Sequence, residues 1–457
     1  AQAIWSKQVE AVQTNSAPTM TRTHRLVSSA RFLSCLGRTE PVSTFRSSFP
    51  IRAVAAVSEK MDASLKDDVL ARPKPWDSYT RPLYNDEDVF EAEQKQVFEA
   101  SWTCIGSVHE FGPGAVRSFT VGTQPLFVTR AKDGKLRAFK NVCRHRASQL
   151  VHAKECQHRS TLICNYHRWC YALDGRLLAA PLFQSKQGGR EKKGGPTEEE
   201  VERLSPPPEG MAKPIMKSFD RSEFHLFSVR LDTLGSLIFV NVDGQAPPLD
   251  EYLGCVTELM AEHAPLFADS SETQVAFTGS YQSKANWKLL LENSTELFQM
   301  LNGRQMMEPE IQGPGMNIVG IRSLCKASLI ELGTMPDFPK LSESNHSEAW
   351  FHAIFPNVFY FCLPHLMYTV RLEPTSSGST VQHVELLVHK KANNEEEKKK
   401  VAQVYDEMML DSIEFCEAVQ KVSDKGDHTL FSGDALWLHK VYADFMTGHA
   451  TVLGDNL

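Results

Sequence analysis

Residues 141–177 read NVCRHRASQLVHAKECQHRSTLICNYHRWCYALDGRL, and this stretch holds four of the chain's ten cysteines. Two mixed pairs stand out within it, Cys143-x-His145 and Cys164-x-x-His167, with eighteen residues between them. Each pair offers one sulfur and one imidazole within a span short enough to form a single loop. Two such loops, facing each other, would bring two thiolates and two imidazoles to one place.

That set of ligands is the one a Rieske-type [2Fe–2S] cluster takes, with two thiolates on one iron and two imidazoles on the other. A tetrahedral Cys2His2 zinc site has the same ligand count and is the alternative. Zinc fingers usually keep their two cysteines together and their two histidines together, whereas each pair here is mixed. The spacing therefore favours the iron–sulfur cluster. Cys156-x-His158 is a third pair in the stretch, and we do not expect it to bind metal.

Turn signals and alternating apolar residues surround the motif and predict a small all-β domain. Before it, Glu87–Ser101 has apolar residues at helical spacing. After it comes a Gly-, Pro- and Glu-rich segment that is too long for a plain connection. We therefore expect four regions: a leader at 1–73, an N-terminal helix region at 74–100, the cluster domain at 101–215 with a mobile loop at 186–213, and a larger α+β domain at 216–457.

The C-terminal region mixes strand and helix patterns. Helices are expected at 287–301 and 393–422, the second with a long apolar face. Strands are expected at 226–242, 318–330, 352–360, 367–372 and 382–389. The overall prediction is an α+β protein made of a small β domain and a larger mixed domain.

Composition limits the partners that the chain can have. A formal net charge of −7 and a pI near 6.2 argue against nucleic acid as the main partner. No apolar run approaches the roughly 20 residues that a membrane-spanning helix needs. Between Met20 and Val57 there are six arginines and one acidic residue, Glu40. That composition predicts an organelle transit peptide for the chloroplast stroma, with the mitochondrion as the alternative.

The motifs NVCRHRA and CNYHRWCYALDGRL resemble the cluster-binding signatures of the Rieske-type non-haem iron oxygenase α-subunits. The likeness continues at LIFVNVDG (237–244), NWKLLLENSTE (286–296), FPNVF (355–359) and EFCEAVQ (414–420), and it is greatest to plastid choline monooxygenase. Asn165 and Arg168 depart from the usual Pro and Gly of the motif. The resemblance implies a helix-grip catalytic-type domain, in which an antiparallel sheet packs against a long helix.

The resemblance also implies a mononuclear Fe(II) held by two histidines and a carboxylate. The positions that match those ligands are Gln299, Arg304 and Ser412. An amide and a hydroxyl are weak ligands for Fe(II), and an arginine adds a fixed positive charge that repels a dication. A functional mononuclear iron in this chain is therefore doubtful. Glu296 matches the acid that bridges neighbouring subunits in the family, and an ordinary structural carboxylate is the equal alternative.

Three functions follow as hypotheses. The first is an oxidoreductase subunit that takes electrons from a ferredoxin-type donor and passes them to the mononuclear iron of a partner. The resemblance implies a trimer for this case, either a homo-oligomer or a hetero-oligomer with an iron-competent paralogue. The second is a self-sufficient monooxygenase that uses dioxygen on choline or another small amine. The third is a non-catalytic redox or binding protein. The sequence does not name the substrate.

Overall fold

The computed structural model describes residues 82–153, 155–181, 183–185, 216–253, 256, 272–302, 318–324, 336–337, 348–423, 442 and 446. The expected leader at 1–73 and the expected loop at 186–213 lie outside these residues. No helix in this part of the chain is long and apolar enough to cross a membrane.

The described chain begins with helical segments, as the apolar spacing predicts. These are α5 (Pro82–Asn85), α6 (Glu87–Glu93) and a π-helical turn at Gln94–Glu99. Asp86 caps α6, because its side chain accepts hydrogen bonds from the backbone N–H groups of Asp88 and Val89.

A seven-stranded antiparallel sheet follows, in the order β1-β12-β11-β4-β3-β2-β5. Its strands are β1 (Thr103–Ser107), β2 (Ala115–Val121), β3 (Gln124–Arg130), β4 (Leu136–Lys140), β5 (Gln157–His158), β11 (Ser228–Leu234) and β12 (Leu237–Asn241). β11 pairs with β4, and β12 pairs with β1. The sheet therefore continues past residue 215, where the sequence predicts the end of the cluster domain. Residues 228–241 return to complete the sheet that 103–140 begin.

Two smaller sheets carry the motif and its surroundings. β6 (Thr161–Ile163), β7 (Cys170–Ala172) and β8 (Leu177–Ala179) form a three-stranded antiparallel sheet, and β9 (Phe183–Ser185) pairs in parallel with β10 (Met216–Phe219). The second Cys/His pair lies in the turn between β6 and β7. Buried aromatic and aliphatic side chains form a separate core around the motif, including Phe127, Phe139, Trp169, Tyr171 and Phe219.

The larger sheet has six antiparallel strands in the order β13-β18-β17-β16-β15-β14. They are β13 (Thr273–Ser283), β14 (Ile318–Leu324), β15 (Glu348–Ile354), β16 (Val358–Leu363), β17 (Leu366–Ser376) and β18 (Ser379–His389). The expected strand at 352–360 is wrong as a single element. β15 ends at Ile354, and a turn through the cis Phe355–Pro356 bond leads into β16.

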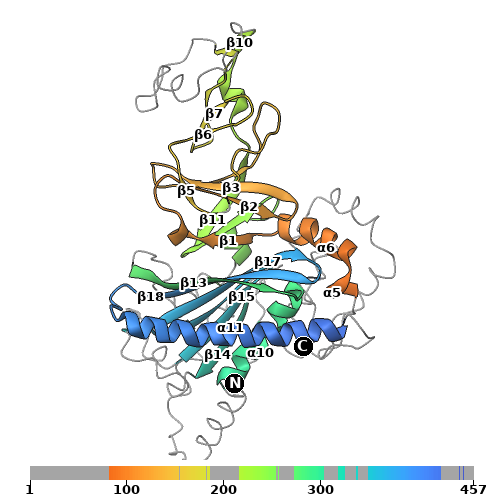
Figure 1. Cartoon of the computed structure of the whole chain (residues 1–457), viewed down its shortest axis with the longest axis vertical. Helices are drawn as coiled ribbons and strands as arrows, with labels where there is room; N and C mark the ends of the chain where they lie inside the picture. Colours follow the sequence, from red (N-terminus) through yellow and green to blue (C-terminus); the bar gives the residue numbers. More distant parts are fainter. Residues whose placement is uncertain are drawn as a thin grey trace, which may run out of the picture. The chain divides into compact units, whose positions relative to one another are not determined.

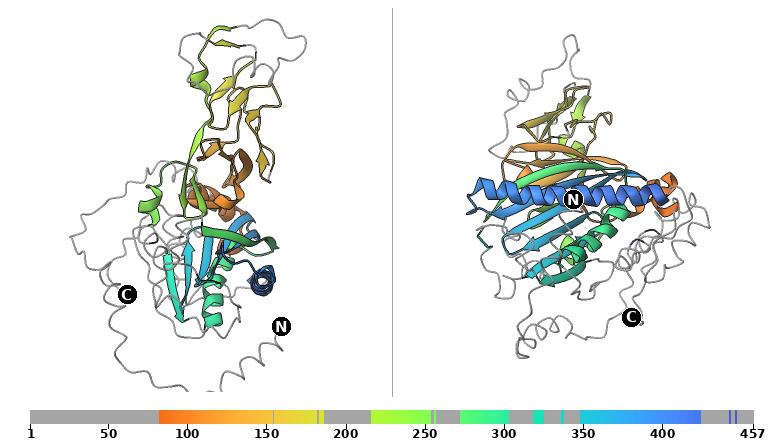
Figure 2. Two further views of the ribbon diagram at one scale, coloured as in Figure 1. Left: turned by 90° about the vertical axis from the view of Figure 1, so that its left-hand side faces the viewer. Right: turned by 60° about the horizontal axis from the view of Figure 1, so that its bottom comes forward.

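The two long helices cover one face of this sheet. α10 (Trp287–Asn302) and α11 (Glu395–Ser423) lie side by side against it, and α11 runs across the strands (Figures 1 and 2). A shorter helix, α8 (Leu249–Leu253), precedes β13. On the helix-covered face, Tyr368, Val370 and Leu372 pack with Val401 and Tyr405 of α11. The α+β prediction is confirmed, including the sheet packed against a long helix.

The opposite face of the six-stranded sheet is apolar along part of its length. There Met367 and Leu387 pack with Cys104, Leu237 and Phe239 of the seven-stranded sheet. Asn357 joins β1 to the start of β16, because it accepts a hydrogen bond from the backbone N–H of Cys104 and donates to the Cys104 carbonyl. The motif FPNVF thus holds the two sheets together.

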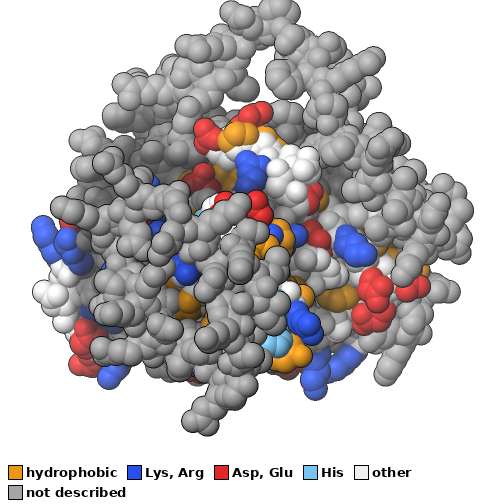
Figure 3. Space-filling view, turned by 90° about the horizontal axis from the view of Figure 1, so that it is seen from above, with side chains coloured by type: hydrophobic (Ala, Val, Ile, Leu, Met, Phe, Trp, Pro, Cys, Tyr) orange, Lys and Arg blue, Asp and Glu red, His pale blue; other side chains and the backbone are white. Residues whose placement is uncertain are grey.

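The surface charge is mixed. On the face seen in Figure 3, Lys and Arg side chains lie among Asp and Glu side chains.

Candidate metal centres

The first Cys/His pair lies in the loop that follows β4. The backbone N–H of Cys143 donates to the carbonyl of Ser148 (2.8 Å), and the N–H of Ala147 donates to the carbonyl of Cys143 (2.9 Å). Ala147 has φ of 53°, in the left-handed region that few non-glycine residues adopt. The loop therefore closes on itself and presents Cys143 and His145 from one tight turn.

The second pair lies in a loop with the same hydrogen-bond pattern. The N–H of Cys164 donates to the carbonyl of Trp169 (2.8 Å), and the N–H of Arg168 donates to the carbonyl of Cys164 (3.0 Å). Arg168 has φ of 61°. This value explains why glycine is usual at the position in the family motif, since glycine reaches that region without steric penalty. The two loops are thus backbone copies of each other.

Buried Asn141 anchors the first loop from its base. Its side-chain amide donates to the carbonyl of Val151 (2.6 Å), and its side-chain oxygen accepts from the N–H groups of Leu150 and Val151. One buried side chain therefore fixes both ends of the segment that carries the first pair.

The structure brings the four predicted ligands together. The sulfurs lie inside, with Cys143 and Cys164 only 3% and 2% exposed. The imidazoles are half-buried, and the ring centroids of His145 and His167 are 4.6 Å apart. Buried thiols beside half-buried imidazoles form an arrangement with an inner sulfur side and an outer histidine side.

Hydrogen bonds surround the Cys164 sulfur and favour its thiolate. The pKa of Cys164 is lowered to about 5, first by a hydrogen bond from the Cys143 thiol and then by the backbone N–H groups of Tyr166 and His167. The Ser148 hydroxyl adds a smaller contribution. These donors are the groups that would stabilise a negatively charged sulfur ligand.

Tyr171 is a fully buried partner of the other sulfur. Its hydroxyl lies 3.3 Å from Cys143 Sγ, where it can donate to the sulfur, and it accepts the backbone N–H of Arg144 at 3.1 Å. The chain therefore places an O–H donor against each of the two sulfurs, Tyr171 on Cys143 and Ser148 on Cys164.

Aromatic rings fix the two histidines. His145 stacks on Trp169 with the ring centroids 5.0 Å apart and an interplanar angle of 5°. His167 lies 3.8 Å from the ring of Tyr166, which is 59% exposed. Burial and the neighbouring His167 lower the pKa of His145, so the neutral imidazole, which is the form that binds metal, is favoured.

These residues fit a [2Fe–2S] group on the chemistry of the donor set. Two sulfurs that accept hydrogen bonds lie next to two imidazoles, which matches what each iron of a Rieske cluster takes. Among the described residues there is no group of three or more His, Cys, Asp or Glu that could hold a single metal ion. A cluster that takes only two protein ligands per iron does not need such a group.

The third pair of the motif lies elsewhere. Cys156 Sγ donates to the carbonyl of Glu110 (3.0 Å), and His158 Nδ1 lies 3.1 Å from the carbonyl of Pro113. Both side chains therefore contact the segment before β2.

The positions expected for mononuclear iron ligands fall on α10 and α11 or beyond the described residues. Gln299 and Glu296 lie in α10, but their side chains are outside what the structure describes, as is the whole of Arg304. Ser412 lies in α11 and is half-buried. Its hydroxyl accepts a hydrogen bond from the side-chain amide of Asn293, at 2.7 Å. Ser412 thus joins the two helices through a direct side-chain contact.

A buried polar network lies one and two turns before Asn293 on α10. Lys288 and Glu93 are both fully buried and form an ion pair. Trp287 Nε1 (2.8 Å) and the Tyr442 hydroxyl (2.7 Å) also donate to Glu93. Nearby, Glu292 accepts a hydrogen bond from the Tyr84 hydroxyl at 2.8 Å. Glu93 of α6 and Glu292 of α10 are therefore both held by protein donors.

Comparison with known families agrees with the two-part architecture. Residues 101–188 match the Rieske [2Fe-2S] domain, and residues 301–448 match the ring hydroxylating alpha subunit catalytic domain. The chain belongs to the Rieske-type non-haem iron oxygenases and corresponds to their α-subunit.

Curated relatives include oxygenases of quaternary ammonium compounds. The chain is 29% identical over 222 residues to the glycine betaine monooxygenase oxygenase subunit of Pseudomonas aeruginosa, covering 48% of this chain and 43% of that protein. It is 26% identical over 228 residues to the carnitine monooxygenase oxygenase subunit of Escherichia coli, covering 49% and 52%. The chain thus spans about half the length of these relatives.

Solved structures show the same fold. The quaternary ammonium Rieske monooxygenase CntA matches with a TM-score of 0.62 at 17% identity, covering 83% of this chain and 98% of that one. Naphthalene 1,2-dioxygenase from Rhodococcus matches with a TM-score of 0.61 at 16% identity, covering 85% and 99%.

Sequence reasoning missed several residues that shape the cluster site. Tyr171, Ser148 and Trp169 contact the predicted ligands, and Asn141 anchors the first loop. Each of the four lies within a few residues of a ligand, so the motif contained them. Only the folded loops show which way their side chains point.

Proposed function

We propose that this chain is an electron-transfer subunit of a Rieske oxygenase, which accepts electrons from a ferredoxin-type donor and passes them to the mononuclear iron of a partner subunit. The single observation that carries the proposal is the environment of Ser412. Its hydroxyl is engaged by Asn293 at the position where the family pattern has a carboxylate ligand. With Gln299 and Arg304 at the two histidine positions, the three positions that match the family pattern do not supply two imidazoles and a carboxylate.

When bound, a [2Fe–2S] cluster supplies one-electron transfer. The residues of this chain would hold it through Cys143, His145, Cys164 and His167. Hydrogen bonds from Tyr171 and Ser148 would stabilise the negative charge that accumulates on the sulfurs. The half-buried imidazoles, with exposed Tyr166 beside His167, would form the side of the site that a partner can approach.

Iron analysis and mixing with a partner test this proposal. The purified chain should contain about two irons per chain and show the paramagnetic resonance signal of a reduced Rieske cluster. It should also co-purify with an iron-competent paralogue and restore that protein's turnover when the paralogue's own cluster is removed. An isolated, inactive homotrimer without such a partner would count against the proposal.

The triple variant Gln299→His, Arg304→His and Ser412→Asp is the matched positive control. It rebuilds the ligand types of the family pattern, two imidazoles and one carboxylate. If the loss of these three ligands is all that prevents iron binding, the variant should gain up to one further iron per chain. A wild-type chain that already holds this iron would show no gain.

The alternative is a self-sufficient monooxygenase of choline or another small amine. It is favoured by the relatives that act on glycine betaine and carnitine. It requires about three irons per chain and oxygen-dependent product formation with reduced ferredoxin as the electron donor and without an iron-competent partner subunit. Iron analysis therefore separates the two proposals.

A further inference from the structure

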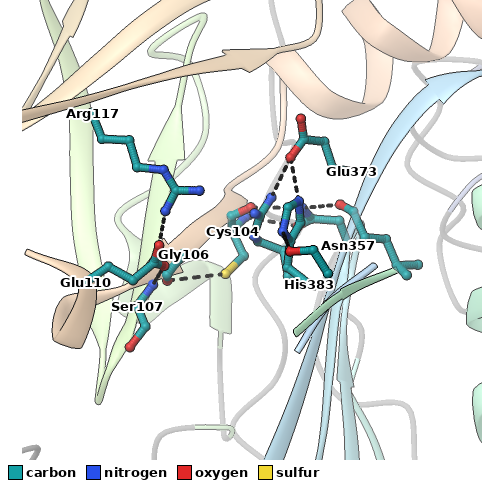
Figure 4. A network of polar contacts seen from close by, with 11 residues as sticks. Cys104, Gly106, Ser107, Glu110, Arg117, Asn357, Glu373 and His383 are labelled. Carbon is teal, nitrogen blue, oxygen red and sulfur yellow. Dashed lines mark hydrogen bonds and ion pairs between the residues drawn. The ribbon is translucent and has the colours of Figure 1, made fainter. Parts of the chain in front are cut away.

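A polar pocket lies between the two large sheets, away from both candidate metal centres. Its walls come from β1, β2 and β12 on one side and from β13, β17 and β18 on the other, and its volume is about 390 Å³. Figure 4 shows the polar side chains that gather there, with Glu110 and Arg117 on one side and Glu373 and His383 on the other. A volume of that size suits a small molecule.

The register of the six-stranded sheet builds the pocket wall. Glu385 of β18 stands opposite Thr369 of β17 and Thr278 of β13. Two residues before Glu385 on β18, and on the same face, His383 stands opposite Arg371 of β17 and Ser280 of β13. Directly opposed residues in antiparallel strands point to the same face. Two polar rows therefore replace the apolar side chains that pack this face elsewhere.

Two acids, Glu110 in the pocket wall and Glu373 beside it, already have protein partners. Glu110 accepts the backbone N–H of Ser107 at 2.8 Å and forms an ion pair with Arg117. Glu373 accepts from His383 Nε2 at 2.8 Å and from Arg371 Nη1 at 3.4 Å. Both acids therefore already have hydrogen-bond partners within the protein and do not need a ligand.

Two buried groups of the pocket are not satisfied by the described residues. Oε2 of Glu385 and Oγ1 of Thr369 are buried at the pocket wall and have no hydrogen-bond partner among them, although the Glu385 carboxyl also accepts a hydrogen bond from Ser107. Glu385 is 9% exposed and Thr369 is 4% exposed. A buried polar group without a partner costs about 1–3 kcal/mol, and more if it is charged. The adjacent groups therefore favour a molecule that donates hydrogen bonds to both.

The other end of the pocket is cationic. Arg371 is buried, and Glu373 engages one of the five N–H donors of its guanidinium. Burial lowers the pKa of Arg117, and the nearby positive charge of Arg371 lowers it further because the two guanidinium groups repel each other. An anionic group between them would relieve that repulsion. The pocket thus favours a hydrogen-bond donor at Glu385 and an anion at the arginines.

We propose that this pocket is a second ligand site, and that it binds a small zwitterion with a protonated primary amine and a carboxylate. The amine donates to Glu385 and Thr369, and the carboxylate lies against Arg371 and Arg117. Glu385 and Arg371 are diagonal neighbours across β18 and β17, and such residues lie roughly 7–8 Å apart. A chain of roughly three to five methylenes between amine and carboxylate suits that spacing.

Protonation gives the site a pH signature. Burial raises the pKa of Glu385 to about 7, and a hydrogen bond from Ser107 only partly offsets it. The pKa values of the neighbouring groups are shifted away from 7. That of Glu373 is lowered to about 2 and that of Cys104 is raised to about 11. The pKa of His383 is lowered from its ordinary value. Glu110, Arg117 and Arg371 are the remaining charged groups that face the pocket. An ammonium pairs with the ionised carboxylate, so affinity should rise with pH through about 7.

Isothermal titration of the full chain with a series from 3-aminopropanoate to 6-aminohexanoate tests the proposal. Saturable binding is expected for at least one member. Butanoate and butylamine, which each lack one of the charged groups, should bind at least about tenfold more weakly, equivalent to about 1.4 kcal/mol. Affinity for the bound member should increase between pH 6 and pH 8.

Variants locate the binding. Glu385→Gln and Thr369→Val should each weaken it, Glu385→Gln by about tenfold or more and with loss of the pH dependence. Glu395→Gln is the matched control, because the Glu395 side chain is 75% exposed on α11, and it should leave affinity unchanged. No heat with any member of the series would mean that water alone fills the pocket, and the proposal would be overturned. Binding that Glu385→Gln leaves intact would overturn it as well.

Discussion

Tyr171 is predicted to set the reduction potential of the cluster site. Its hydroxyl lies 3.3 Å from Cys143 Sγ in a fully buried position. Reduction adds negative charge to the site, and a donor to sulfur stabilises the reduced form more than the oxidised one. Tyr171→Phe removes this donor and keeps the ring that fills the core.

The size of the shift follows from the strength of such a bond. A hydrogen bond contributes about 0.5–1.5 kcal/mol, and about 1.5–3 kcal/mol when one partner is charged. We take this hydrogen bond to be about 1 kcal/mol stronger in the reduced state than in the oxidised state. Its loss then lowers the one-electron reduction potential by roughly 40 mV, because 59 mV corresponds to a tenfold change in the equilibrium constant. The shift is downward, since the reduced form loses the most stabilisation.

A redox titration followed by paramagnetic resonance measures this shift. Tyr166→Phe is the matched control, because it removes a hydroxyl from a tyrosine that is 59% exposed and keeps the ring beside His167. The control should shift the potential far less than Tyr171→Phe. An unchanged or raised potential in Tyr171→Phe would refute the assigned role of the hydroxyl.

Three further predictions concern stability. Arg168→Gly should raise the free energy of unfolding by about 1 kcal/mol in urea titrations, because Arg168 has φ of 61°, and an unchanged value would contradict a strained loop. Lys288→Met should lower the free energy of unfolding by about 3–5 kcal/mol, because it leaves the fully buried Glu93 carboxylate without a cation. Adding Glu93→Gln should recover part of that loss. A small effect of Lys288→Met alone would argue against the buried ion pair. For Glu385, the folded-state pKa of about 7 exceeds the ordinary 4.5, so its stabilising contribution is complete below about pH 4.5 and is lost as pH rises through 7. Relative to Glu385→Gln, the wild type should therefore lose roughly 3 kcal/mol between those pH values, and parallel stability profiles would contradict the shifted pKa.

Spacing within short segments was enough to predict the cluster ligands and the long helices. The positions of Cys143, His145, Cys164 and His167 and the long helices could be read from the sequence, because each depends on spacing within a short segment. The structure places these four side chains together, while their role as cluster ligands stays a prediction. The left-handed conformation of Ala147 could not be read in the same way, since alanine carries no signal for it.

Long-range pairing explains what was missed. β11 and β12 complete a sheet begun more than a hundred residues earlier, and nothing near residue 230 indicates that partner. The polar pocket is harder still to foresee, because Glu385 and Thr369 lie on neighbouring strands of one sheet, whereas Ser107 comes from β1, far earlier in the chain. Their juxtaposition depends on the register of the six-stranded sheet and on the contact between the two sheets.

The most direct test of whether this chain holds a cluster without a mononuclear iron is the iron content of the purified wild-type chain, measured together with its paramagnetic resonance spectrum after reduction. About two irons per chain and a Rieske signal are expected, because the donor set of Cys143, His145, Cys164 and His167 suits one cluster while Ser412 is engaged by Asn293. About three irons per chain, or a reduced protein without the Rieske signal, would contradict it.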